Sequence, residues 1–540
     1  MRVHENTSVW RNGMVAAALG LVLIAAAGDA LAQGRKDTLL VLVESGPNNL
    51  DIQGVGTSFR SYVASWNTHD RLVSFGTKTL ADGTLSYDYT KIVGELAERY
   101  EFAPDGMSVT FHLRRGTTFH DGSPVTARDV KWSFDRAVSV GGFPTFQMSA
   151  GSLTKPEQFE VVDDYTFKVK FLLKDKLTLP DMAVPVAAIY NSELAKKHAT
   201  AQDPWALDWL KTNVAAGGAF KLEKWTPGQE TVYTRFDEWK NGPLPAVKRV
   251  ILREVPSAGN RRALMEKGDA DISIDLPPKD AAEITASGKY RIVGVPVENS
   301  LLYVGFAVKQ PPFDNVKVRQ ALAYAIPYEA IMKTAVYGRG VPMFGGPADG
   351  PKTAAWPQPF PYTTDIAKAK ALLAEAGFPN GFESTVSIDL GDATVSEPAA
   401  VLLQESLAQA GVRTTINKVP GANWRGALAK KDLPIHIASF GGWLNFPDYW
   451  FYWGYHSQNG TFNTMGYQNP EMDKFIDAAR YEDDAEKYDG AVKGFIRMAM
   501  TEVPRVPLYQ QFMDVGFQKN ISGYKYWFHR QLDFRQLVKN

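Results

Sequence analysis

The sequence predicts a multidomain α/β protein whose first half is rich in strands and whose second half alternates helices with strands. With 540 residues, the chain is long enough for two to four domains. Its composition, 45% hydrophobic and 22% charged, is typical of soluble globular proteins. The chain has no cysteine, so a large hydrophobic core must supply the stability that disulfides give to many small secreted proteins.

The N-terminus has the features of a secretory signal. Arg2 and Arg11 give a weakly basic start, an apolar run spans 14–28, and the triplet at 30–32 matches the A-x-A pattern of a cleavage site. The run is shorter than the ~20 residues that a membrane-spanning helix needs, which leaves an uncleaved anchor as the weaker alternative. We expect 1–32 to be a cleaved signal peptide. With no cysteine to carry a lipid anchor, the mature protein is expected to be free in the periplasm.

Strand-like segments dominate the first half of the mature chain. Residues 38–43 (TLLVLV) form a continuous apolar run followed by turn residues, as in a buried strand. Residues 107–116 alternate apolar and polar side chains, and the segments 159–171 and 217–236 each contain two strand-like runs around a turn. We therefore predict one buried strand followed by strand pairs and hairpins.

Helices and strands alternate in the second half. The segment 364–378 places apolar residues on one helical face and stops at a glycine, and 400–411 is a second helix that ends in glycine. Short runs at 384–388 and 412–416 follow these helices and predict strands. This order is typical of α/β packing around parallel strands.

The stretch 119–137 (FHDGSPVTARDVKWSFDRA) raises the question of a catalytic site, because His120 stands beside Asp121. A turn follows the pair, and Thr126 and Asp129 have the spacing of a capping box at the start of a helix. Adjacent side chains in a turn seldom point at each other, as a catalytic pair would require. We interpret the stretch as scaffold.

A family resemblance begins in the same region. Residues 94–137 resemble the signature region of the bacterial periplasmic solute-binding proteins of the dipeptide, oligopeptide and nickel class (family 5), which deliver ligands to ATP-driven importers. Further segments match in the family's order along nearly all of the mature chain: PNNLD (47–51), DDYTFKVKF (163–171), GGAFKLEKWTPGQ (217–229), GDADI (268–272), PPFDNVKVRQALAYAI (311–326) and AKALLAEAGFPNGF (369–382).

The resemblance implies a periplasmic-binding-protein fold (type II, cluster C), in which two lobes joined by a hinge close over a ligand. On this chain, lobe I is expected at 33–75 with 190–290 and 505–540, an inserted β-rich domain at 76–189, and the α/β lobe II at 291–504. The implied partners are inner-membrane ABC permease subunits with their ATPases. We expect a monomer without a cofactor.

An aromatic-rich segment, 441–467 (GGWLNFPDYWFYWGYHSQNGTFNTMGY), is the principal candidate for ligand contact. Rigid rings bury a large area at small entropic cost, although half of these rings are expected to form ordinary core. In peptide-binding relatives an aspartate that receives the ligand's ammonium group follows the tryptophan. Here Trp443 is followed by Asn445, and the first acid is Asp448, with Tyr449 next to it.

Other candidate ligand-binding residues lie in loops. Asn48, Asn49, Gly56 and Thr57 follow the first predicted strand, where binding crevices form in α/β proteins, and a purely structural turn is the stronger alternative for most of them. Arg339 offers a bidentate fork for a ligand carboxylate, with an ordinary loop arginine as the equal alternative.

Other classes of function are disfavoured. Nucleic-acid binding is disfavoured, because the formal net charge is zero and the sequence has no run of five lysines or arginines. The sequence has no G-x-S-x-G, H-E-x-x-H or Walker A motif, and its eight histidines have no metal-ligand spacing, so we expect neither an enzyme nor a metal site. A hydrolase whose carboxylates converge in a cleft and a chaperone-like periplasmic protein are the remote alternatives.

We therefore predict a substrate-binding protein of an ABC importer that binds di- or oligopeptides. Ala307 and Pro327 stand where relatives usually carry asparagine and aspartate. These departures, with Asn445, leave an opine, a small oligosaccharide or a metal chelate as alternative ligands.

Overall fold

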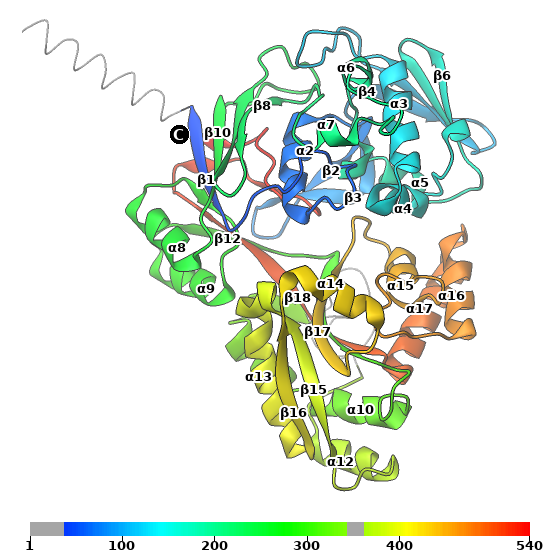
Figure 1. Ribbon diagram of the computed structural model, residues 1–540, viewed down its shortest axis with the longest axis vertical. Helices are drawn as coiled ribbons and strands as arrows, with labels where there is room; N and C mark the ends of the chain where they lie inside the picture. Colours follow the sequence, from blue (N-terminus) through cyan, green and yellow to red (C-terminus); the bar gives the residue numbers. More distant parts are fainter. Residues whose placement is uncertain (1–36, 343–360) are drawn as a thin grey trace, which may run out of the picture.

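The computed structural model describes residues 37–342 and 361–540. This part of the chain forms two halves, one above the other in Figure 1, with β12 and β18 running between them. Its strands form four sheets, of twelve, four, three and two strands. The predicted signal peptide lies outside the described residues. No helix in the described part is long and apolar enough to cross a membrane.

The upper half is built around the first strand. β1 (Thr38–Val43) is mostly buried and pairs in parallel with β10 (Arg249–Glu254) and β11 (Ile272–Ser273). An antiparallel hairpin of β8 (Phe220–Thr226) and β9 (Glu230–Arg235) extends this sheet beyond β10. The buried strand and the hairpin predicted for this region are confirmed.

The β-rich segment that follows β1 forms smaller sheets at the outer end of the upper half. The first contains β2 (Val73–Thr79) and β3 (Leu85–Gly94), and the chain's end adds β20 (Lys525–Tyr526) to it. The second is antiparallel, in the order β4 (Ala97–Phe102), β5 (Ser108–Leu113), β7 (Thr166–Lys170) and β6 (Phe159–Asp163). Helix α3 (Ala127–Ser139) packs on this second sheet, where Phe134 meets Phe159 at 5.2 Å between ring centroids.

The start of α3 confirms the interpretation of its sequence as scaffold. The backbone N–H and the hydroxyl of Thr126 both donate to the Asp129 carboxylate, at 3.0 and 2.8 Å. Nε2 of His120 lies 2.9 Å from the carbonyl oxygen of Gly218, while Asp121 accepts from the backbone and hydroxyl of Ser123. His120 and Asp121 therefore serve different local contacts and form no catalytic pair.

The lower half has the predicted alternation of helices and strands. Its sheet has the order β16 (Val412–Val419), β15 (Phe382–Asp389), β17 (Ile435–Gly441) and β13 (Ser300–Phe306), with β15 parallel to both of its neighbours. Helices surround this sheet or lie beside it, among them α10 (Val316–Ala325), α12 (Ile366–Glu375), α13 (Ala393–Gln409), α14 (Gly421–Lys430), α15 (Pro447–Tyr455), α16 (Pro470–Arg480) and α17 (Ala485–Glu502).

One long strand belongs to both halves. The first part of β18 (Arg505–Phe517) pairs with β13 in the lower half, and its last part, 512–517, pairs with β12 (Arg291–Pro296) in the upper half. The chain enters the lower half through residues 297–299 and returns within β18. The predicted division into domains remains a proposal, and its limits at 290/291 and 504/505 fall at the starts of these two connecting strands.

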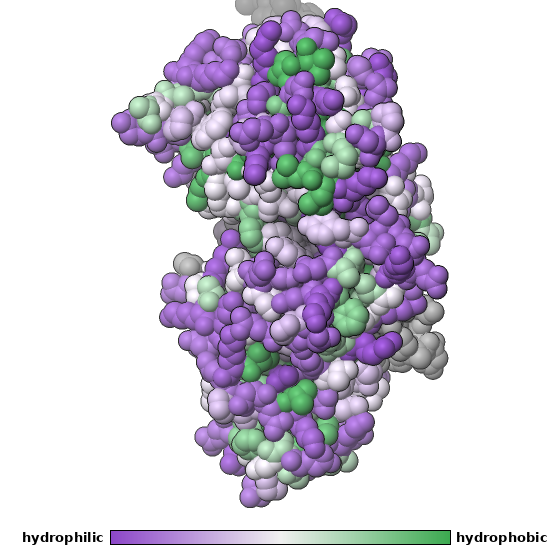
Figure 2. Space-filling view, turned by 90° about the vertical axis from the view of Figure 1, so that its right-hand side faces the viewer, coloured by the Kyte–Doolittle hydropathy of each residue, from purple (hydrophilic) through white to green (hydrophobic). Residues whose placement is uncertain are grey.

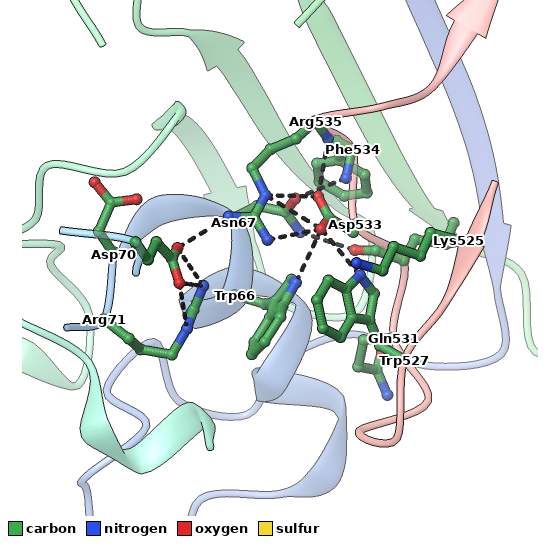
Figure 3. Close-up of polar contacts among 12 residues, drawn as sticks. Trp66, Asn67, Asp70, Arg71, Lys525, Trp527, Gln531, Asp533, Phe534 and Arg535 are labelled. Atoms are coloured by element: carbon green, nitrogen blue, oxygen red, sulfur yellow. Dashed lines mark hydrogen bonds and ion pairs between the residues drawn. The ribbon is translucent and has the colours of Figure 1, made fainter. Parts of the chain in front are cut away.

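After β18 the chain returns to the upper half, where a buried network fastens it to α2 (Tyr62–Thr68), as Figure 3 shows. The indole N–H groups of Trp66 and Trp527 donate to Asp533 at 3.3 and 3.0 Å. Burial alone raises the pKa of a carboxyl, but the guanidinium of Arg535 and these hydrogen bonds outweigh it and hold the pKa of Asp533 below its usual value.

The network continues into the first sheets. Arg535 also bonds Glu95 at 2.9 Å, and Glu95 accepts from Arg71 at 2.6 Å. The amide of Asn67 donates to the carbonyl of Leu532 and accepts from the backbone N–H of Phe534. Residues 525–535 are thereby held rigidly against α2.

Replacing Asp533 by alanine is expected to destabilise the upper half. The change leaves two indole N–H groups without an acceptor and leaves Arg535 with Glu95 alone, and removing one partner of a buried ion pair costs about 3–5 kcal/mol. The midpoint of urea unfolding should fall clearly. Glu471→Ala is the control, because the exposed pair of Glu471 with Lys474 contributes little. Equal midpoints for the two variants would contradict this role of Asp533.

Candidate ligand-binding cleft

The two halves face each other across a cleft. Figure 2 shows that the molecule narrows between the halves, with a notch on its left edge. The ring of Tyr62, at the start of α2, meets the ring of Trp443 from the lower half at 4.9 Å, edge to face. This contact brings the halves together at an aromatic surface.

Trp443 lies at the centre of this surface. Its ring also meets Phe143, in α4 (Gly142–Ala150) of the β-rich segment, at 4.9 Å. Only 6% of the residue is exposed. A side chain at the preceding Gly442 would collide with the ring of Tyr449, so glycine lets the chain reach this position. Trp443 therefore contacts both parts of the upper half.

Asn445 lies near the connection between the halves. Its amide nitrogen donates to Glu298, in the short segment between β12 and β13, at 3.3 Å. Glu298 also pairs with Lys78 at 3.5 Å. The amide oxygen of Asn445 is buried and has no hydrogen-bond partner among the described residues. An unsatisfied buried acceptor of this kind is suited to a donor group of a ligand.

Asp448 and Tyr449 lie on α15 and face the β-rich segment. The carboxylate of Asp448 accepts from the hydroxyl of Tyr488 at 2.9 Å and lies 3.6 Å from the ammonium of Lys176. Burial raises the pKa of this carboxyl. The hydroxyl of Tyr449 donates to Gln147 in α4 at 3.0 Å. Both side chains thus join the lower half to the upper one beside the cleft.

The predicted residues after β1 shape the loop that leads to α2. Asn48 accepts from the backbone of Ser58 at 2.8 Å, and its amide donates to the carbonyl of Gly56. Asn49 accepts from the backbone of Asp51 within the same loop, and Thr57 donates to the carbonyl of Asp51. Gly56 adopts φ +78°, where a side chain would be strained. All four have structural contacts here.

Arg339 directly precedes β14 (Gly340–Pro342), and its side chain reaches Asp514 on β18. Its guanidinium forms an ion pair with Asp514, and Nε lies 3.1 Å from the same carboxylate. The side chain of Asp514 is 2% exposed. The positive charge that the sequence offered to a ligand is therefore already paired within the protein.

Three charged residues of the cleft were not predicted. Arg60, next to Phe59, donates to both oxygens of Asp275 at 2.7 and 2.8 Å. Arg530, in the C-terminal segment, lies over the ring of Phe59 at 4.6 Å. Asp392, at the start of α13 in the lower half, interacts electrostatically with both arginines. No local pattern in the sequence marks any of the three.

A second hollow lies beside the cleft. It has a volume of about 510 Å³ and is lined by the β-rich segment, including Tyr89, Phe171 and Lys176, and by Phe446 of the lower half. It contains none of the predicted ligand-binding residues. Across residues 37–342 and 361–540, no group of three or more metal-ligating side chains is placed to hold a metal ion.

The arrangement of two halves, one shared strand and an aromatic cleft can be compared with known proteins. The family model of the bacterial extracellular solute-binding proteins, family 5, matches residues 91–462. The chain belongs to this family. The predicted resemblance is therefore confirmed, and the family's members are transport proteins that bind solutes.

The glutathione-binding protein GsiB of Salmonella choleraesuis (strain SC-B67) is 28% identical over 522 residues, which cover 94% of this chain and 95% of that protein. The solved structure of AgaA from A. tumefacien R10, in complex with agropinic acid, is 26% identical with a TM-score of 0.76, over 93% of this chain and 99% of that one. A dipeptide-binding protein from Pseudoalteromonas sp. SM9913, in complex with Met-Leu, has a TM-score of 0.78 at 20% identity, over 93% and 100% of the two chains. These neighbours share the type II two-lobed fold, which confirms the predicted fold class.

Arg339→Gln is expected to lower the stability of the protein. The change leaves the buried carboxylate of Asp514 without its charged partner, at a cost of about 2–3 kcal/mol, less than for a fully buried pair because Arg339 is partly exposed. Differential scanning calorimetry should show a lower melting temperature without ligand. Asp514→Asn in the same background should restore part of the loss. An unchanged melting temperature with abolished ligand binding would instead make Arg339 a ligand-binding residue.

Proposed function

We propose that this protein is the periplasmic substrate-binding component of an ABC importer and that it binds di- or oligopeptides. The observation that carries the proposal is the contact between Tyr62 and Trp443. These rings belong to different halves, and among the described residues the chain passes between the halves at 297–299 and within β18. The rings would therefore separate if the halves rotated apart. A ligand held between them would contact both halves only in the closed form. Binding then favours closure by its differential affinity for that form.

A peptide ligand is supported by the relatives. GsiB is named for glutathione, and the Pseudoalteromonas protein was solved with Met-Leu. Both ligands are short peptides with free carboxylates. The cleft offers rings for side chains, and the unsatisfied amide oxygen of Asn445 suits a donor such as a peptide N–H.

An opine is the second candidate ligand. AgaA, whose structure contains agropinic acid, is more similar in sequence than the solved dipeptide-binding protein. In addition, the aspartate that receives the ammonium group in peptide-binding relatives has no clear counterpart here, since Asn445 follows Trp443 and the first acid is Asp448. A buried ammonium without a paired charge would cost several kcal/mol. A small oligosaccharide and a metal chelate rank below these two.

The location and the partners follow from the family. We propose that residues 1–32 are removed on secretion and that the mature monomer moves in the periplasm without a lipid anchor. The closed form would be recognised by inner-membrane permease subunits, whose associated ATPases supply the energy. We further propose that the chain is not an enzyme, since the side chains of His120 and Asp121 are engaged in the scaffold contacts of α3.

A thermal-shift experiment tests this proposal. The mature protein is melted with Met-Leu, glutathione, agropinic acid or maltotriose. A ligand present at 100-fold its dissociation constant adds about 2.7 kcal/mol to the free energy of unfolding. We expect Met-Leu or glutathione to raise the melting temperature and maltotriose to leave it unchanged. A shift with agropinic acid alone would make the opine the ligand, and hydrolysis of either peptide during incubation would contradict a binding protein.

A further inference from the structure

Arg530 occupies a fixed and strained position in the C-terminal segment. Its backbone φ is +58°, a left-handed conformation that is unfavourable for a residue with a side chain and is often found at ligand sites. Its backbone N–H donates to the carbonyl of Trp527 at 2.9 Å. Because the network around Asp533 holds this segment against α2, the position of the Arg530 side chain is set by rigid surroundings.

The guanidinium of Arg530 has no polar partner. It lies over the ring of Phe59 at 4.6 Å, interacts electrostatically with Tyr62 and Tyr526, and is half-buried. Among the residues described, 37–342 and 361–540, none forms a hydrogen bond or an ion pair with this guanidinium. Burial lowers its pKa, and the opposing effects of Tyr526, Tyr62 and Asp392 do not outweigh the loss of water.

Other arginines near this surface have their charges matched. Arg60, the neighbouring cation, is held by both oxygens of Asp275. Buried arginines elsewhere in the upper half all have polar partners. Arg71, Arg136 and Arg535 each pair with a carboxylate, and Arg261 donates to three backbone carbonyls. Partly buried charges are costly unless they are paired. The missing partner of Arg530 therefore points to a group that arrives from outside the chain.

We propose that Arg530 binds a carboxylate of the ligand and forms the fixed positive end of the cleft. The inference rests on the proposed function and names the ligand group that this function requires. A guanidinium presents its N–H donors in a planar fork that matches a carboxylate, and such bonds are stronger than those between neutral groups. The ring of Phe59 supports the flat face of the guanidinium and leaves its edge for the ligand.

The charge that faces Arg530 narrows the class of ligand. Asp392 belongs to the opposite half, is exposed, and has no ion-pair partner among the described residues. The surrounding protein displaces part of the water around the carboxyl of Asp392, and this effect together with the neighbouring Asp389 raises its pKa, while Arg530 and Arg60 act in the other direction. A ligand with charges of both signs complements Arg530 and Asp392 together. Met-Leu with free termini has this property, whereas a dianion would be repelled by Asp392.

Isothermal titration calorimetry with Met-Leu and Met-Leu amide tests the inference. We expect the amide to bind the wild-type mature protein at least tenfold more weakly, because it lacks the carboxylate. Arg530→Gln should bind Met-Leu at least tenfold more weakly than wild type and should no longer distinguish the acid from the amide. Arg128→Gln is the matched control, since Arg128 pairs with Asp164 on the exposed surface of the β-rich segment and should behave as wild type.

The outcomes separate this inference from the proposed function. If the wild type binds Met-Leu and Met-Leu amide equally well, the inference is wrong, but the proposed peptide ligand is not contradicted. This comparison requires no variant. The inference is also wrong if Arg530→Gln still distinguishes Met-Leu from Met-Leu amide as strongly as the wild type does. Asp392→Asn leaves the strained turn at Arg530 untouched. This variant should bind N-acetyl-Met-Leu more tightly than the wild type does. An unchanged affinity would contradict the proposal that the charge of Asp392 acts on the ligand. If the wild type binds neither Met-Leu nor glutathione, the proposed peptide class fails, and the inference fails with it.

Discussion

The backbone pairing of β18 is the constraint on which the rest of the structure depends. One continuous strand forms hydrogen bonds with β13 at one end and with β12 at the other, so neither half can move away without breaking a ladder. We propose that the halves instead rotate about the middle of β18 and residues 297–299, which would keep both ladders intact. The ion pair of Arg339 with Asp514 and the hydrogen bond of Asn445 with Glu298 both lie at these connections. The hinge is therefore narrow and well defined.

The two sides of the cleft differ in how their charges are satisfied. Inside the upper half, guanidinium and carboxylate groups form closed networks, such as the one around Asp533 that fastens the end of the chain. At the cleft, aromatic rings meet across the gap, while Arg530 and Asp392 have no ion-pair partners within 37–342 and 361–540. A protein that exchanges its ligand needs this division. The groups that bind the ligand must be unpaired before it arrives, whereas the groups that hold the scaffold together must already be paired.

The fold could be predicted from the sequence to a large extent, because local periodicity determines it. The apolar run at 38–43 became β1, the helix expected at 364–378 became α12, and the capping pair of Thr126 and Asp129 starts α3. Trp443 was found through the density of rings around it. Half of the rings in that segment were expected to be core, but all of them, Trp443 included, belong to the large core cluster or pack against it.

The remaining features depend on partners that are distant in sequence. Asp514 lies 175 residues after Arg339, so no local pattern distinguished this hinge pair from a ligand site. Asn48 and Thr57 form structural contacts in the loop before α2, and the sequence alone could not tell such a turn from a surface that holds a ligand. No local sequence pattern marks Arg530 or Asp392, because these two residues are brought near each other only by the arrangement of the two halves. The shared role of β18 was missed for the same reason.

The central claim is that the two halves close about β18 over a ligand, and single-molecule energy transfer tests it most directly. The chain has no cysteine, so Glu193→Cys in the upper half and Arg413→Cys in the lower half, both highly exposed, give clean labelling sites. Met-Leu should shift the population to a shorter separation, and Trp443→Ala should shift the ligand-free population to a longer one. A single separation that neither the peptide nor the substitution changes would contradict closure about this strand.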